Sequence, residues 1–568
     1  MSSKDKNTTN GKRHDFFGAI SAYETGFEEL NVTGNKNINV INDKILSEGK
    51  RVDLMLIVSP VNLLYKWMPL YYLYLAGFLE KHGFKVSIIE PHFTKGLNQL
   101  DDARNVEFIL NEVKKQNPKF IGFASFVTDY KVVLDLAKKV RKISNATTLI
   151  GNAQPSISPG DYIYDGSPFD ICVRGEGELT TKEILESKLD VDSLNKIEGI
   201  SFFDKNKIGP DNKIGSVVIN HNRGLIDMKE LGMPAYHLID MNWYTTPTKY
   251  VVKRLTASAA TIYISRGCPY KCTFCASNMV WHSNSKTKGG GSFVRFRPME
   301  MVIEDLRILQ DKYDVDFFYI QDDTFGIHEP HIHEFCDAYK KSGLKMLWCA
   351  QTRTPCISKP EIVKKLRDSG CIQLDFGIES GSPRILKDLR KLITVEDAYK
   401  AFDLCRKGGM RTYANMMINM PGETEEDLAL SHKLLERIKP TFLGFGVTQP
   451  YPGTALYNKV PKIDKDEYHL LDRMFPPEKW RLAAHKLDLK KTIDEYLIKY
   501  KIVTLFEKHF FSAGFDYWKK IFTSKHRYKY IYYILRSLLG PPVAYFRFRW
   551  ENFRYTRGMW KPSAEDTK

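Results

Sequence analysis

Alternation between strand-like and helical segments is the feature that most constrains how this sequence can fold. From Arg51 to about Leu189, apolar runs of strand length are separated by segments with helical spacing. Strands separated by helices pair in parallel and carry helices on both faces of the sheet. We therefore predict an α/β domain of the doubly wound, Rossmann-like parallel-sheet type over residues 51–189. Its expected strands are residues 52–59, 85–90, 119–125, 148–151 and 170–174.

A second alternation begins at Thr261. Thr394 and Thr424 each stand three residues before an aspartate, which is a pattern typical of helix N-caps. Six strand–helix units in succession predict a partial TIM-type α/β barrel over residues 257–463, with the chemistry at the carboxyl ends of its strands. The expected strand cores are residues 262–265, 317–321, 346–350, 373–378, 412–418 and 443–447, and helices are expected over residues 299–313 and 395–407.

The remaining segments lack this alternation. Residues 1–50 are polar, and we predict a disordered arm without a secretory signal. Residues 190–256 contain scattered prolines and are predicted to be a linker with a short hairpin. Residues 464–568 are helical in pattern, aromatic and basic, in a chain of net charge +16. Because no apolar run reaches the about 20 residues that a membrane span needs, we expect a cytoplasmic protein that could lie on a membrane surface.

The cysteines point to a metal site. They number nine, which is odd, and none precedes Cys172. A disulfide framework fits this distribution poorly, whereas a metal site in a reducing compartment fits it well. Cys268, Cys272 and Cys275 follow a predicted strand on one short loop, and three such thiolates can hold three irons of a [4Fe–4S] cluster. The alternative is a structural zinc loop, which needs four protein ligands, with His282 as the nearest downstream candidate.

With Phe274 before its last cysteine, this triplet resembles the signature of radical S-adenosylmethionine (radical SAM) enzymes. The resemblance extends from about Thr261 to Tyr457. It implies that the open iron binds S-adenosylmethionine, whose reductive cleavage yields a 5′-deoxyadenosyl radical. Asn419 and Met420 depart from the glycine and leucine that are common at their positions. The residues that the family's strand-end motifs imply for S-adenosylmethionine binding are Asp322, Asp323, Arg353, Glu379, Ser380, Pro421 and Gly422.

Residues 51–189 resemble the cobalamin-binding domain that precedes many radical SAM cores. The most specific piece is Arg174-Gly175-Glu176-Gly177-Glu178, which closes the domain. The loop after the first strand lacks the Asp-x-His-x-x-Gly sequence that would supply a histidine to cobalt, which implies base-off binding. Asn152 and Gln154 depart from the family pattern, so a domain that has lost its cofactor is the alternative. The residues implied for cobalamin binding are Ser125, Gly151, Glu176 and Glu178.

The end of the chain interleaves basic and aromatic residues between Arg527 and Trp560. This composition suits a membrane interface, and a packed helical cap with a basic face is the alternative. The composition would also suit nucleic acid. That partner is disfavoured because RNA-modifying radical SAM methylthiotransferases usually carry an extra N-terminal cysteine domain, and no cysteine precedes Cys172.

The layout as a whole resembles cobalamin-type radical SAM enzymes that modify large apolar molecules. Hopanoid methylases, the anaerobic tetrapyrrole cyclase and tetraether lipid ring synthases are examples. The resemblance implies an enzyme that forms a carbon–carbon bond on an isoprenoid membrane lipid, by ring closure or methylation, with an electron donor such as ferredoxin or flavodoxin. Methylation of a small secondary metabolite and a non-catalytic cluster or cobalamin sensor are the alternatives.

Overall fold

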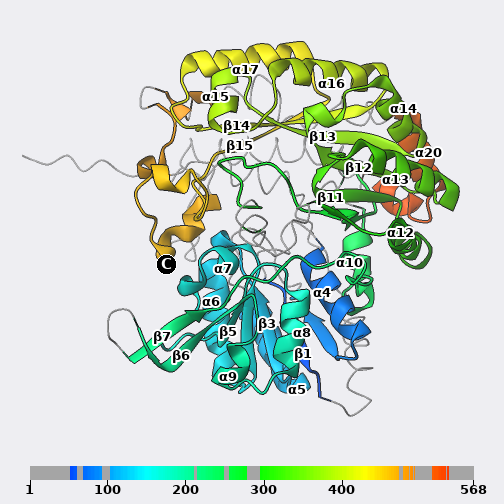
Figure 1. Ribbon diagram of the computed structural model, residues 1–568. Helices are drawn as coiled ribbons and strands as arrows, with labels where there is room; N and C mark the ends of the chain where they lie inside the picture. The colour runs from blue at the N-terminus through cyan, green and yellow to red at the C-terminus, as the bar shows by residue number, and fades with distance from the viewer. Residues whose placement is uncertain are drawn as a thin grey trace, which may run out of the picture.

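The computed structural model contains two large sheets, drawn one above the other in Figure 1, and a two-stranded sheet formed by β9 (Ser265–Arg266) and β10 (Arg295–Phe296). It describes residues 51–59, 68–91, 103–209, 214–247, 252, 255–277, 280, 294–472, 477–484, 487–489, 491–492, 514–532 and 534–535. The arm predicted over residues 1–50, His282 and most of the basic aromatic segment 527–560 lie outside the described residues.

The first sheet has the strand order β2-β1-β3-β4-β5-β6-β7, and β1 to β5 pair in parallel. Every residue of β1 and β2 is buried, as expected for a parallel sheet covered on both faces. The predicted doubly wound fold is therefore confirmed. The parallel strands are β1 (Leu54–Ile57), β2 (Val86–Ile89), β3 (Phe120–Ala124), β4 (Thr147–Gly151) and β5 (Ile171–Val173). The main helices beside them are α4 (Leu70–Lys81), α5 (Ala103–Gln116), α6 (Tyr130–Arg141) and α8 (Glu178–Glu186).

The segment expected to be a linker adds to this sheet. β6 (Ile200–Ile208) and β7 (Ile214–Ile219) form the hairpin that the sequence predicts, and β6 pairs antiparallel with β5. The sheet therefore continues past residue 189. The reason is that β5 would otherwise present an unpaired backbone edge, and the hairpin supplies its hydrogen-bonding partners.

The second sheet has the order β15-β14-β13-β12-β11-β8, and every neighbouring pair is parallel. In Figure 1 the helices lie along its outer side and its inner side faces the first sheet, as in a partial barrel. The strands are β8 (Ala259–Ile262), β11 (Phe317–Phe325), β12 (Leu347–Thr352), β13 (Cys371–Glu379), β14 (Arg411–Ile418) and β15 (Phe442–Val447). The main outer helices are α12 (Met299–Tyr313), α13 (Glu329–Ser342), α14 (Pro360–Asp368), α16 (Val395–Lys407) and α17 (Glu425–Ile438).

The first barrel strand lies earlier in the chain than the sequence predicts. The strand expected over residues 262–265 ends at residue 262. The backbone amides of Ile264 and Ser265 donate to Asp322 Oδ1 at 2.8 and 3.1 Å, so these two residues do not extend the parallel ladder. They lead instead into the short strand β9 (Ser265–Arg266) and the cysteine loop.

The two domains are joined through a buried ion pair. Arg297 and Asp305 lie 2.8 Å apart with both side chains fully buried. Arg297 also donates to the hydroxyl of Tyr74 in α4, and the hydroxyl of Tyr236 donates to Asp305, both at 2.8 Å. One cluster of buried apolar residues runs from α4 into α12 and the barrel strands around this pair. The orientation of one domain on the other is therefore fixed inside a shared core.

The C-terminal region contacts both domains: Tyr468 packs in the core of the first domain and donates to Asp161 at 3.1 Å, whereas residues 514–532 pack on the barrel. Helix α20 (Gly514–Thr523) contributes Tyr517, whose hydroxyl donates to the carbonyl of Thr256 at 3.0 Å. Tyr530 is also fully buried and donates to Asp316 at 3.0 Å. Residues 514–535 thus resemble the packed cap that the sequence leaves as an alternative. Among the described residues, none of the helices combines the length and the apolar character needed to cross a bilayer.

Candidate active site

The cysteine loop begins after β9, close to the carboxyl end of β8, where the sequence predicts the chemistry. No disulfide joins any of the nine cysteines, all of which are described. Gly267 enters the loop at φ 97°, a conformation that favours glycine, and its amide donates to Asp323 at 3.0 Å. Burial raises the pKa of Cys268 and of Cys275 above the ordinary thiol value. Binding iron must therefore displace protons from these thiols.

The arrangement of the three thiols is compatible with a cluster. Cys275 N donates to Cys272 O at 3.2 Å, which folds the loop back on itself. Within the part of the chain that the structure describes, no three cysteine, histidine or acidic side chains converge as ligands of one metal ion. A [4Fe–4S] cluster does not require such convergence, because each cysteine binds a different iron. The donor set is therefore suited to a cluster with three protein ligands.

The two aspartates at the end of β11 are placed differently. Asp322 is 1% exposed and accepts hydrogen bonds from the amides of Ile264 and Ser265 and from the Ser265 hydroxyl. It therefore anchors the chain just before the cysteine loop. Asp323 is half-buried, and its charge adds to the effect of burial in raising the pKa of Cys268. Of the two carboxylates, Asp323 is the one that lies beside the thiols.

Burial raises the pKa of Asp322 to about 7, although its hydrogen bonds to Ser265 and Ile264 act in the opposite direction. The folded pKa lies above the unfolded value of about 3.9, so this carboxyl stabilises the fold most at low pH. That contribution is lost as the pH rises through 7. We expect Asp322→Asn, which cannot ionise, to gain stability relative to the unaltered protein between pH 4 and 7, by at most about 1.4 kcal/mol per pH unit.

The check is a set of urea titrations of both proteins across this pH range. Asp322→Ala is the control, because it loses the hydrogen bonds at every pH. Parallel pH curves for the unaltered protein and Asp322→Asn would contradict the raised pKa of Asp322.

Arg353 follows β12 and connects two sides of the site. Its Nη1 lies 3.9 Å from Cys272 Sγ, and its guanidinium carbon lies 3.7 Å from the centre of the Tyr270 ring. The other terminal nitrogen donates to the carbonyl of Lys391 and, at 3.4 Å, to that of Leu392. This buried cation therefore holds the cysteine loop against the segment that follows β13.

Glu379 ends β13 with a φ of 71°, which is uncommon for a residue with a side chain. Lys391 Nζ donates to its carboxylate at 2.7 Å, and both side chains are buried. The same ammonium lies 5.7 Å from the ring of Phe274 in the cysteine loop. Lys391 is a site residue that the sequence did not single out, and no local pattern marks it.

Ser380 lies next to Glu379 at the same strand end. Its hydroxyl accepts from the amide of Ser382 at 3.1 Å and lies 3.4 Å from the hydroxyl of Ser431. A side chain at Gly381 would come within 2.5 Å of the carbonyl oxygen of Leu430 in α17. The turn after β13 is therefore packed directly on α17.

Pro421 and Gly422, which the resemblance implies for S-adenosylmethionine binding, form a turn after β14. Gly422 has a φ of 62° and donates to the carbonyl of Leu482 at 2.8 Å. Asn419, which departs from the family pattern, also has a positive φ of 65° and accepts from the amides of Leu482 and Ala483 at 2.9 and 3.1 Å. Asparagine tolerates this conformation better than most residues. The C-terminal region therefore fixes the shape of this turn.

Ser125 and Gly151 lie at the carboxyl edge of the first sheet, as predicted. Ser125 is fully buried, donates to Asp129 at 2.9 Å and accepts from the hydroxyl of Tyr162 at 2.9 Å. Burial raises the pKa of Asp129 to about 7. A side chain at Gly151 would lie 3.4 Å from the carbonyl of Val173 in β5. Asp129 and Tyr162 are thus part of this edge, although the sequence did not mark them.

Glu176 and Glu178 lie at the junction between the domains. Glu176 accepts from Arg266 at 3.0 Å and from Arg295 at 2.9 Å, and Glu178 accepts from Arg266 at 2.8 Å. The two arginines belong to the paired strands β9 and β10 (Arg295–Phe296). The carboxylates that the resemblance implies for cobalamin are thus placed as ion-pair partners of arginines next to the cysteine loop.

Two family models match the chain. The model described as "Radical SAM superfamily" matches residues 262–435, which include the cysteine loop and the four barrel strands β11 to β14. The model described as "B12 binding domain" matches residues 60–185, which cover β2 to β5 of the first sheet.

Three curated relatives are similar over much of the chain. A cytidylyl-2-hydroxyethylphosphonate methyltransferase of Streptomyces wedmorensis is 26% identical, covering 72% of this chain and 82% of its own. An anaerobic magnesium-protoporphyrin IX monomethyl ester cyclase of Rubrivivax gelatinosus is 24% identical, covering 83% and 79%. A hopanoid C-3 methylase of Methylococcus capsulatus is 24% identical, covering 64% and 65%.

A solved structure shares the fold. It is TsrM from Kitasatospora setae, a radical S-adenosylmethionine methyltransferase with cobalamin and a [4Fe–4S] cluster bound. The TM-score is 0.54 at 18% identity, over 72% of this chain and 74% of that one. At this identity the similarity concerns the fold alone.

Proposed function

Because the chain belongs to the radical SAM superfamily and carries a B12-binding domain, we propose that it forms a carbon–carbon bond at an unactivated carbon, by ring closure or methylation. The chain is an enzyme, and its cofactors are a [4Fe–4S] cluster, S-adenosylmethionine and cobalamin. The resemblance that the cysteine triplet and the first domain suggest in the sequence is confirmed by both family matches.

The observation that carries the proposal is the meeting of the two sheets at their carboxyl edges. Parallel sheets bind ligands beyond the carboxyl ends of their strands. Glu176 and Glu178 follow β5 at one such edge, and they pair with Arg266 directly before the cysteine loop at the other. A substrate held between the edges would therefore lie close to both cofactor sites.

The site residues can be assigned roles on this basis. When it is reduced by one electron, bound S-adenosylmethionine supplies the radical that removes a hydrogen atom from the substrate. Cys268, Cys272 and Cys275 would hold the cluster, and the Arg353 cation beside Cys272 would stabilise its thiolate. Asp323 would accept a hydrogen bond from the methionyl amino group, because its carboxylate is held beside the cysteine loop by the amide of Gly267.

The first domain would hold cobalamin at Ser125 and Gly151. Both residues lie at the carboxyl edge of the sheet, and the hydrogen bonds of Ser125 with Asp129 and Tyr162 fix its hydroxyl there. This loop would supply no histidine to cobalt, because residues 58–69 after β1 contain none, and we propose that cobalamin binds in the base-off form. The absorption spectrum of the bound cobalamin distinguishes the base-off from the base-on form.

For the substrate we propose an isoprenoid membrane lipid. Two of the relatives are named for a hopanoid and for a protoporphyrin ester, which are large and mostly apolar molecules. The relative named for a cytidylyl phosphonate keeps a small metabolite as the second candidate.

Apolar side chains exposed near the C-terminus support a membrane lipid. Phe515, Phe522, Tyr528 and Tyr532 are all more than half exposed. Exposed basic residues such as Lys529 alternate with them. Rings and cations together suit the headgroup region of an anionic membrane.

The function is tested by anaerobic incubation of the reconstituted protein with S-adenosylmethionine, a reductant and lipids from a strain that lacks the gene. We expect 5′-deoxyadenosine and a lipid of altered mass, and the same strain should accumulate the precursor lipid. Turnover only with a water-soluble metabolite fraction would favour the second candidate. Absence of S-adenosylmethionine cleavage with every fraction would contradict the proposed reaction.

Membrane contact can be tested without truncation, which would remove the buried Tyr517 and Tyr530. We expect the triple variant Phe515→Ser, Phe522→Ser, Tyr528→Ser to bind anionic liposomes at least about tenfold more weakly, because each exposed ring that enters the interface contributes apolar burial. Co-sedimentation with liposomes measures this. The matched control replaces Ile208, Ile214 and Ile219, exposed on the β6–β7 hairpin, with serine. Equal loss in both triples would place membrane contact elsewhere.

A further inference from the structure

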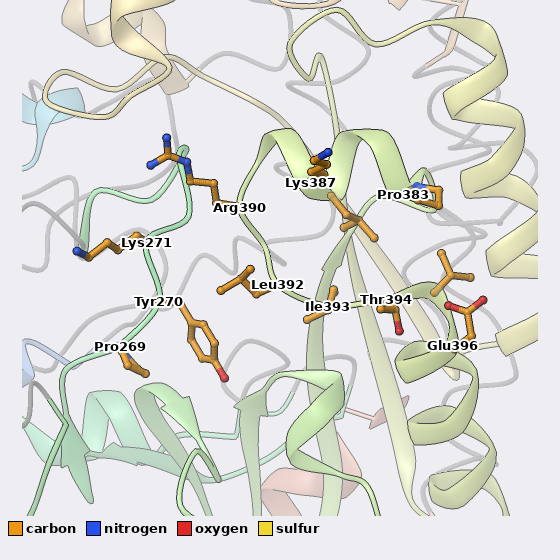
Figure 2. Close-up of a pocket in the computed structure, with 12 residues that line it drawn as sticks. Pro269, Tyr270, Lys271, Pro383, Lys387, Arg390, Leu392, Ile393, Thr394 and Glu396 are labelled. Carbon is orange, nitrogen blue, oxygen red and sulfur yellow. The ribbon is translucent and has the colours of Figure 1, made fainter.

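A hollow of about 610 Å³ opens beside the cysteine loop (Figure 2). One wall consists of Pro269, Tyr270 and Lys271, which lie between the first two cysteines. The other wall comes from α15 (Pro383–Asp388) and the segment that leads into α16. None of the residues proposed above to bind a cofactor lines the hollow. It is therefore a second feature of the surface, next to the cluster site but distinct from it.

Arg353 is the side chain that lies between the hollow and Cys272. The Tyr270 ring lines it and lies 3.7 Å from the guanidinium of Arg353. Arg353 Nη1 is in turn 3.9 Å from Cys272 Sγ. Arg353 also donates to the carbonyls of Lys391 and Leu392 on the opposite wall. A single buried cation thus contacts both walls and the thiol that would hold iron.

The opposite wall presents an apolar side chain on a strained backbone. Leu392 is 71% exposed, and both it and Arg390 have a φ of 51°. Such a conformation costs on the order of 1–3 kcal/mol for a residue with a side chain, and it persists only where the surroundings impose it. Here the carbonyls of Lys391 and Leu392 accept from Arg353, and the amide of Arg390 donates to the carbonyl of Lys387 at the end of α15. The fold therefore maintains an exposed leucine directly beside the cluster site.

Basic side chains surround this leucine. Lys271, Lys387 and Arg390 line the hollow and are exposed, and among the described residues that line it Glu396 is the one carboxylate. In Figure 2, Lys271 belongs to the cysteine loop, whereas Lys387 and Arg390 belong to α15 and the segment after it. The nearby acids Asp388 and Asp427 both pair with Arg384, so these three side chains together add one negative charge against the three lining cations. The surface is therefore cationic with an apolar centre.

We propose that this hollow is the docking surface for an acidic one-electron carrier protein that reduces the cluster. The inference rests on the proposed function, since it assigns a partner to the same redox site. One electron leaves the reduced iron–sulfur or flavin group of the carrier, which is thereby oxidised, and enters the cluster, which is reduced. No bond or proton is exchanged. The cations steer an acidic partner to the surface, and Leu392 excludes water from the contact.

The test compares charge variants of the holoenzyme. Lys387→Glu/Arg390→Glu reverses the charge of the hollow, and Lys387→Gln/Arg390→Gln only removes it. Lys271 is left unchanged because it lies between two cluster cysteines. The matched control Lys139→Glu/Lys433→Glu makes the same change in net charge on exposed positions of α6 and α17. Leu392→Ser tests the apolar centre.

The first readout is binding of an oxidised acidic ferredoxin at low salt, which involves no electron transfer. We expect the charge reversal to slow association by about tenfold or more, the neutral variant to have a smaller effect, and the control to have almost none. The difference should shrink at 0.5 M salt, where the screening length is only a few ångströms. Leu392→Ser should instead speed dissociation, with little dependence on salt.

The second readout is cleavage of S-adenosylmethionine driven either by the reduced ferredoxin or by dithionite. We expect the charge reversal to lower only the ferredoxin-driven rate.

If the unaltered enzyme does not cleave S-adenosylmethionine with dithionite, the proposed function is contradicted. The ferredoxin-binding measurement would still test the docking surface, because it involves no cleavage. The docking proposal is overturned by equal ferredoxin binding in reversal and control variants, or by an unaltered enzyme that binds neither acidic ferredoxin nor acidic flavodoxin. The docking proposal would also be overturned if the charge reversal weakened binding to anionic liposomes but left carrier binding intact. That result would assign the hollow to a membrane.

Discussion

Replacing Cys268, Cys272 and Cys275 with alanine is expected to abolish both the cluster and the formation of 5′-deoxyadenosine. The unaltered protein, reconstituted without oxygen, should hold about four iron and four sulfide per chain. The triple variant should hold almost none, because each thiolate binds a separate iron and an alanine side chain has no atom that can bind iron. Iron and sulfide analysis together with chromatography of the nucleoside product measures the effect.

The matched control is Cys356→Ala, which removes another thiol close to the site. Its amide bonds to the carbonyl of Arg353, so it tests whether any nearby cysteine would have the same effect. We expect it to keep the cluster. The other barrel cysteines should also be dispensable for the cluster, namely Cys336, Cys349, Cys371 and Cys405. A triple variant that retains full iron and activity would refute the assignment of the cluster.

Replacing Arg297 with methionine is expected to lower the free energy of unfolding by about 3–5 kcal/mol. The substitution leaves Asp305 fully buried without its cationic partner, and it removes the hydrogen bond to Tyr74 across the domain junction. The loss should appear in urea titrations followed by near-ultraviolet circular dichroism, which reports on the packing of the surrounding aromatic rings.

The double variant Arg297→Met/Asp305→Leu is the control that separates charge from packing. It removes both charges, so most of the stability lost in the single variant should return. Tyr236 keeps its place in the core in both proteins, although it loses its bond to Asp305 in the double variant. A double variant no more stable than the single one would show that shape, and not the uncompensated charge, determines the cost.

The local pattern of the sequence determined the elements and the chemistry of the cysteine loop. The helices predicted over residues 299–313 and 395–407 have these bounds in the structure. Thr394 and Thr424 both form the expected capping boxes. These features depend on residues within about one helical turn or one strand of each other, so their signals lie side by side in the chain. The cysteine triplet is local in the same sense.

Only the tertiary structure decided which side chains meet. The sequence predicts Glu176 and Glu178 as cofactor-binding residues, whereas in the structure they pair with Arg266, some ninety residues away. The basic tail pattern did not reveal that Tyr530 is buried against Ser258 and Asp316. The hollow combines the cysteine loop with a segment more than a hundred residues later. Such contacts depend on how strands and helices pack across the whole chain, and packing leaves no periodic signal near either partner. The sequence therefore determines which elements form and which metal chemistry is possible, while the packing of distant segments decides which carboxylates lie beside the cysteine loop and which hold the domains together.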